Sequence, residues 1–160
     1  MEVPCPLRNE KGNAMDTIGN QIAWRLGYLT ILQGVIARLA NSAAAMKAGS
    51  VAVLTALLAC AVGQQAPFHW ALFVLPGLLF MGFHAFFLQQ ERAFVQLYNT
   101  AGDAPLAQVL SYRIDAARLA AVREPLLSVL CRPTVWAFHL PLLAGVVLVY
   151  QGLREASPCC

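Results

Sequence analysis

The chain has 160 residues, of which 59% are hydrophobic and 12% are charged, and its formal net charge is +3. Water-soluble domains are usually about 45–50% apolar and about 25% charged, so this composition argues against an ordinary soluble domain and points toward the bilayer. The net charge is too small to indicate a nucleic-acid partner, and we expect none.

The first segment of the chain is polar. Residues 1–15 contain prolines and no apolar core segment, so we predict a disordered tail and no secretory signal. Asp16 suits the N-cap of a helix that begins near Thr17. Apolar residues then recur at the three- and four-residue steps of one helical face. They are Ile18, Ile22, Leu29, Leu32, Ile36 and Leu39.

The opposite side of this helix is narrow and carries small and polar residues. They are Asn20, Ala23, Gly27, Thr30, Gly34, Arg38 and Asn41. Small residues at helical spacing let a second helix approach closely, which favours tight self-packing. The alternative is a helix that lies in the membrane interface with this strip in water. Arg25 and Gln33 fall within or beside the apolar arc, where they either reach out to water or make a buried contact with another subunit or a ligand.

Residues 48–90 contain no Asp, Glu, Lys or Arg. This run is about twice as long as the ~20 residues that cross a hydrocarbon core of ~30 Å. Turn-forming residues interrupt it once, at residues 63–67. We therefore predict a hairpin of two transmembrane helices over about 44–63 and 68–88.

The hairpin and the helix before it form one predicted unit, residues 16–98. The upstream helix either runs straight into the first span, as a long rod that projects from the membrane, or kinks at Asn41 and Ser42. Residues 99–132 are amphipathic and predict a cytoplasmic helical loop, with one helix over Leu106–Glu124.

Residues 133–153 predict a third transmembrane helix. They carry no charge, and Arg132 and Arg154 bracket them. Trp136 and Tyr150 lie near the two ends, as in an aromatic belt. A re-entrant or surface-lying helix is the alternative, and residues 154–160 form a short tail.

The distribution of basic residues predicts the orientation. With three spans, Arg154 is alone among the Lys and Arg residues on its side, and all the others fall on the opposite side. Such an asymmetry places the basic side in the cytoplasm. We therefore expect a multi-pass protein of the cell inner (plasma) membrane with a cytoplasmic N-terminus. Arginines of the predicted loop, such as Arg118, Arg123 and Arg132, would attract anionic lipid headgroups.

The sequence contains no pattern of catalytic, cofactor-binding or metal-ligating residues. A Gly-rich phosphate loop, a nucleophile elbow and a zinc-binding His motif are all missing. We therefore expect no catalytic residue, no cofactor and no metal. His84 is the residue of most interest, because an ionisable group inside a span is a functional candidate. It is either a histidine at the inner boundary that is hydrogen-bonded to a neighbouring helix or a functional residue, and a membrane-embedded enzyme would use His84 or His139.

The stretch Ile31–Ser42, followed by Lys47, the hairpin and Gln89–Arg92, resembles a group of small uncharacterised bacterial membrane proteins. The resemblance covers about Gly27–Tyr98, and that group has no settled function to carry over. The individual residues that match its pattern are Gln33, Arg38 and Asn41.

In outline the chain is also similar to SLATT-type membrane modules, in which a hairpin is joined to long cytoplasmic helices. That resemblance implies a pore-forming effector that acts beside a nucleotide-signalling defence system. The third hydrophobic segment of this chain departs from the two-span module.

Together these observations predict an all-helical integral membrane protein with three spans and a layer of cytoplasmic helices. The leading hypothesis is an oligomeric effector that perturbs the bilayer, with the lipid bilayer and further copies of the chain as partners. Its candidate packing and polar-contact residues are Gly27, Gln33, Gly34, Arg38, Asn41 and His84. The alternative is an accessory or scaffold subunit that docks a cytoplasmic protein through Leu106–Glu124. An enzyme is not expected.

Overall fold

The computed structural model describes residues 7–63, 69–105 and 113–155. The described chain is all-helical and contains no strand. Its helices are α1 (Leu7–Gly63), α2 (Ala71–Asp103), α3 (Ala116–Val122), α4 (Leu126–Leu130) and α5 (Pro133–Glu155). Among them α1, α2 and α5 are long and apolar enough to cross a membrane. The predicted helical class with three such helices is therefore confirmed.

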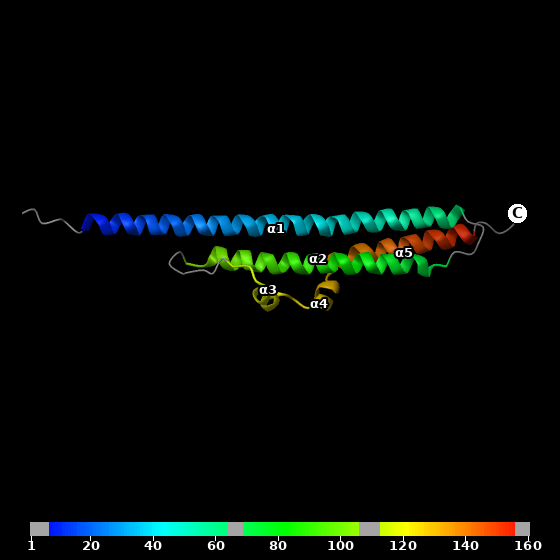
Figure 1. Cartoon of the computed structure of the whole chain (residues 1–160). Coiled ribbons are helices and arrows are strands. Elements are labelled where there is room, and N and C mark those ends of the chain that lie inside the picture. Colours follow the sequence, from blue (N-terminus) through cyan, green and yellow to red (C-terminus); the bar gives the residue numbers. More distant parts are fainter. Residues whose placement is uncertain (1–6, 64–68, 106–112, 156–160) are drawn as a thin grey trace, which may run out of the picture.

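Helix α1 is one uninterrupted rod of 57 residues (Figure 1). At a rise of ~1.5 Å per residue it is about 85 Å long, which is more than twice the thickness of a hydrocarbon core. Of the two alternatives for the junction with the first apolar segment, the structure has the continuous helix, without a break at Asn41 or Ser42.

The start of α1 corrects the sequence prediction. The helix begins at Leu7 and passes through Asp16, which therefore does not cap it, and the predicted disordered tail is helical from Leu7 onward. The residues from Leu7 to Met15 include Leu, Arg, Glu, Lys, Ala and Met, which are strong helix formers. Gly12 and Asn13 are weaker helix formers, but no proline interrupts this segment, and the helix continues through it to Asp16.

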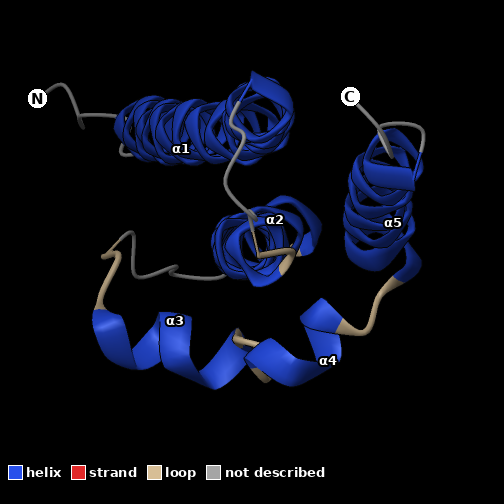
Figure 2. Cartoon of the chain, turned by 90° about the vertical axis from the view of Figure 1, so that its right-hand side faces the viewer, coloured by secondary structure: helices blue, strands red, loops and turns tan. Residues whose placement is uncertain are grey.

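Helix α2 occupies the centre of the molecule. It runs antiparallel beside α1, and α5 packs beside both over the half of the rod that contains the end of α1 (Figure 1). Viewed from the end in Figure 2, α2 lies between α1 and α5, while α3 and α4 cover its remaining side. Helix α2 thus contacts each of the other four helices.

Three buried clusters hold these helices together. The first joins α1, α2 and α5 and contains Leu54, Ala61, Phe73, Val146 and Tyr150. The second joins α1 to the C-terminal part of α2 and contains Tyr28, Leu32 and Ala101. The third joins α2, α4 and α5 and contains Ala85, Val129 and Val135. Many other large apolar side chains of the described residues are exposed, which is consistent with helices that could cross a membrane.

The connection between α2 and α5 is less helical than predicted. Of the helix expected over Leu106–Glu124, residues 106–112 lie outside the described part, residues 113–115 are not helical, and within the described remainder only α3 is helical. Asp115 caps α3, because its Oδ1 accepts a hydrogen bond of 2.8 Å from the backbone N–H of Arg118. Pro125 then precedes α4 as its N-cap residue.

Candidate functional site

The structure separates the six candidate residues into two groups. Five of them are exposed on α1, and they are Gly27, Gln33, Gly34, Arg38 and Asn41. The sixth, His84, is only 2% exposed and lies inside the helix bundle. The candidates therefore do not form one site, and each group is described separately.

The exposed group belongs to a longer row of residues, which we name the outer stripe of α1. Its members recur at steps of three and four from Ala23 to Ala59, and every one is exposed. They are Ala23, Gly27, Thr30, Gly34, Arg38, Asn41, Ala45, Ala48, Ala52, Ala56 and Ala59. The side of α1 that packs on α2 and α5 carries Leu32, Leu54 and Ala61 instead. Gln33 is exposed beside the stripe rather than on it.

Most side chains of the outer stripe are smaller than the large apolar side chains exposed on α2 and α5. On α2 the exposed side chains include Leu75, Leu79 and Phe83, and on α5 they include Leu140 and Leu148. The stripe over the same part of α1 consists of alanines. Small residues are typical of contacts between membrane helices, because they let two backbones approach closely.

The glycines of the stripe are open. A Cβ atom added at Gly27 or Gly34 would meet nothing within 4 Å. Two other glycines are covered, because Phe80 lies over Gly49 and Leu143 lies against Gly77. No described residue of the chain therefore occupies the space at Gly27 and Gly34, where another helix could pack.

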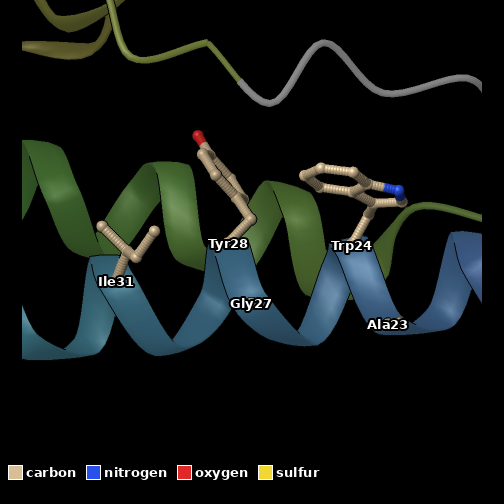
Figure 3. Close-up of a pocket in the computed structure, with 5 residues that line it drawn as sticks. All are labelled: Ala23, Trp24, Gly27, Tyr28 and Ile31. Atoms are coloured by element: carbon tan, nitrogen blue, oxygen red, sulfur yellow. The ribbon is translucent and has the colours of Figure 1, made fainter.

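A shallow cavity of ≈ 420 Å³ adjoins the stripe near its N-terminal end. The described residues that line it all belong to α1, and Ala23 and Gly27 are among them. The larger lining side chains, Trp24, Tyr28 and Ile31, project to the same side of the helix (Figure 3). Trp24 is 70% exposed and Ile31 is 60% exposed. This end of α1 thus presents large apolar side chains next to small ones.

Arg25 has a role that neither sequence-based alternative described. Its Nη1 donates to the carbonyl oxygen of Ala104 at 2.7 Å, and its Nη2 donates to that of Pro105 at 3.0 Å. Ala104 is the C-cap residue of α2. A cation is favoured there, because the last carbonyls of a helix are unpaired and carry the negative end of its dipole. Arg25 therefore ties α1 to the end of α2 within one chain.

His84 forms a pair with His139 of α5. The Nδ1 of His84 lies 3.2 Å from the Nε2 of His139, and both residues are buried. One nitrogen must carry a hydrogen and the other must accept it, so at least one ring is neutral in this contact. On α1, Lys47 lies 5.8 Å from the ring centroid of Phe138, which neighbours His139. The pair thus lies among three helices.

A polar cluster lies at the C-terminal end of the charge-free part of α2, and we name it the Glu124 cluster. The Nη2 of Arg132 donates to Glu124 Oε2 at 2.8 Å, and the Nε of Arg92 lies 3.8 Å from Glu124 Oε1. Gln89 donates through Nε2 to the carbonyl oxygen of Glu124 at 2.6 Å. These contacts fix the segment between α3 and α4 to α2 and to the start of α5.

Sequence reasoning found the first half of the outer stripe but not the second. The signal was present, because Ala45, Ala52 and Ala59 continue the spacing that Gly27 and Gly34 begin. The histidine pair had no such signal, because its members are 55 residues apart and meet only through the packing of α2 on α5.

Comparisons with known proteins add no family. No protein-family model matches this chain, and comparison with curated proteins and with solved structures found no match. The resemblance to SLATT-type modules therefore stays a prediction. Among the described residues, no group of three or more His, Cys, Asp or Glu side chains is placed to hold a metal ion.

Proposed function

We propose that this protein is a small multi-pass protein of the inner membrane that assembles with copies of itself through the outer stripe of α1, and that the assembly perturbs the bilayer. The observation that carries the proposal is the unbroken row of exposed, mostly small residues along α1. Among the residues that the structure describes, none lies within 4 Å of a Cβ atom added at its glycines Gly27 and Gly34.

The length of α1 supports self-assembly. Helix α1 has 57 residues and is about 85 Å long, whereas a hydrocarbon core is ~30 Å thick, so much of this helix would lie outside the core. The part outside the bilayer carries exposed Ile22, Trp24, Leu26 and Ile31. A straight helix cannot cross the membrane at one end and lie flat on it at the other. A second copy of the chain would cover these side chains.

The chemistry of the stripe fits a contact between identical helices. Gly27, Gly34 and the alanines permit close packing of two backbones. Asn41 has an amide that both donates and accepts, so it can bond to its own copy. Arg38 is long enough to extend along the helix toward the bilayer boundary.

The orientation belongs to the same proposal. Lys47 and the basic residues of the N-terminal part of α1 and of the α2–α5 connection fall on one side, and Arg154 falls on the other. The excess of basic residues supports a cytoplasmic N-terminus in the inner membrane.

The first test of the proposal is the mass of the protein in detergent, measured by light scattering. We expect Gly27→Leu and Gly34→Leu to reduce the oligomer, because each adds a large side chain to the stripe. Gly82→Leu is the matched control, since a Cβ at Gly82 on α2 also meets nothing within 4 Å. Unchanged mass in both stripe variants would refute the proposal.

The bilayer effect has its own assay, the release of a dye from vesicles. We expect the wild-type protein to release the dye and Gly34→Leu to release less, while Gly82→Leu behaves as the wild type. If Gly34→Leu is monomeric and still releases the dye as fast, assembly and bilayer perturbation are separate properties.

A second function, an accessory subunit that docks a cytoplasmic protein, rests on a different observation. Helix α3 has no buried residue, and Leu127 of α4 is 75% exposed. The surface of the α2–α5 connection is therefore available to a partner. Deletion of residues 113–122, which spares Glu124, should abolish co-purification of a stoichiometric partner if this function holds.

A further inference from the structure

A cavity of ≈ 640 Å³ lies between α2 and the start of α5. The polar residues that line it are Glu91, Arg92, Gln96, Asn99, Arg132 and Thr134. Two of these are arginines and the others offer amide, hydroxyl or carboxylate groups. The cavity adjoins the Glu124 cluster, which shares Arg92 and Arg132 with it.

The two arginines have donors left over. A guanidinium carries five N–H groups, and Arg132 uses one nitrogen, Nη2, for its hydrogen bond to Glu124. The Nε of Arg132 is buried and has no hydrogen-bond partner. The Nε of Arg92 lies 3.8 Å from Glu124, which is beyond hydrogen-bonding distance. Glu124 alone does not accept hydrogen bonds from all the N–H groups of the two guanidinium groups. An anion in the cavity would provide further acceptors for them.

The start of α5 adds to this preference for an anion. Helix α5 begins at Pro133 and has 23 residues, so the positive end of its dipole faces the region of Thr134. The carbonyl oxygen of Arg132 accepts from the backbone N–H groups of Val135 and Trp136, which places the Arg132 backbone directly at the helix start. The hydroxyl of Thr134 is a further donor at the cavity wall.

The cavity lies where the apolar segments of two candidate membrane-spanning helices end, which is where a lipid headgroup would lie if these helices cross a bilayer. The charge-free run of α2 ends at Gln90, and that of α5 starts at Pro133, so the cavity marks the boundary of both apolar segments. Leu88 and Val95 also line it and supply apolar surface next to the arginines. Basic pockets between membrane helices at this depth are suited to anionic lipid headgroups.

We propose that this cavity binds a phosphate group, held by Arg92, Arg132 and the Thr134 hydroxyl. The phosphate belongs either to the headgroup of an anionic lipid or to a soluble phosphate compound. Glu91, Gln96 and Asn99 provide acceptors for the hydroxyl groups attached to such a phosphate. This site lies within one chain and does not depend on the self-assembly of α1.

Native mass spectrometry of the full-length protein in neutral detergent tests this site, with phosphatidylglycerol as the anionic probe and phosphatidylcholine as the zwitterionic one. We expect the wild-type protein to retain more phosphatidylglycerol than phosphatidylcholine. Arg92→Gln and Arg132→Gln should each lower this retention about tenfold, as expected for a lost charge-assisted hydrogen bond. Arg154→Gln, at the opposite end of α5, is the control and should retain the lipid as the wild type does.

Two further arms complete the test. Thr134→Val keeps the ion pair between Arg132 and Glu124, so it remains informative if the arginine variants fail to fold, and it should lower retention several-fold. Inorganic phosphate that displaces the lipid would assign the site to soluble phosphates, and lipid binding that resists phosphate would assign it to the headgroup. Equal retention by Thr134→Val and wild type, or an equal loss in Arg154→Gln, would overturn the proposal.

Discussion

His84 of α2 and His139 of α5 approach within 3.2 Å, Nδ1 to Nε2, and their rings are tilted by 54°. Both side chains are buried, so this polar contact has no competition from water. It joins the two helices next to the third buried cluster, because His84 precedes Ala85 and His139 lies one helical turn from Val135. If one partner of a buried hydrogen bond is removed, the other partner stays buried without a hydrogen bond, and this lowers the stability of the folded protein.

The histidine pair predicts a double-mutant result. His84→Leu or His139→Leu alone should destabilise the protein by about 1–3 kcal/mol, because the remaining ring keeps a buried, unpaired nitrogen. The double variant should cost clearly less than the sum, because it leaves no polar group behind. Unfolding in detergent with a denaturing surfactant measures all three. Additive effects would show that the two rings do not depend on one another.

The close contact of Gly77 with Leu143 predicts a steric effect. Gly77 is buried in α2, and a side chain there would collide with Leu143 of α5. Gly77→Leu should destabilise the protein by about 1–3 kcal/mol. Gly82→Leu, on the same helix with open space around it, should be nearly neutral. Adding Leu143→Ala to Gly77→Leu should recover part of the loss, and a lack of recovery would contradict this packing.

The two hydrogen bonds of Arg25 predict a local effect at the end of α2. Arg25→Met keeps the apolar stem but removes both donors to Ala104 and Pro105. The last turn of α2 should then open more often, with amide hydrogen exchange faster by about fivefold for a loss of ~1 kcal/mol. Arg154→Met, on α5, is the control. Unchanged exchange at residues 99–105 would show that Arg25 contributes nothing to that end.

The alanines of the outer stripe predict that its second half contributes to assembly. Ala52→Leu or Ala56→Leu should reduce the oligomer as Gly27→Leu does, because both lie on the same exposed row. Val53→Leu, one residue along and off the stripe, is the control. Sedimentation in a density-matched detergent gives the mass. If only Gly27→Leu and Gly34→Leu act, the contact is confined to the N-terminal half of α1.

The sequence was sufficient to predict three apolar helices, because charge-free runs of this length are typical of membrane-spanning helices. The continuity of α1 was one of two alternatives, since Asn41 and Ser42 permit a helix but do not require one. The start of α1 was predicted wrongly, because Asp16 has the right chemistry for a cap but the residues before it also favour a helix.

The contacts between distant residues were beyond prediction from the sequence. Arg25 and Ala104 are 79 residues apart, and Gln89 and Glu124 are 35 apart. Each contact depends on how far one helix slides along another, which the pattern of apolar residues leaves open. The outer stripe lies on a single helix, so the three- and four-residue spacing of a helical face was enough to predict all of it.

Cysteine cross-linking in native membranes tests the central claim, assembly through the outer stripe, most directly. The five native cysteines are replaced, and a single cysteine is placed at Ala45 on the stripe or at Leu75, an exposed position of α2 that is off it. Oxidation should give a disulfide-linked dimer with Ala45→Cys and little or none with Leu75→Cys. Equal cross-linking at both positions, or none at Ala45, would contradict the proposed contact.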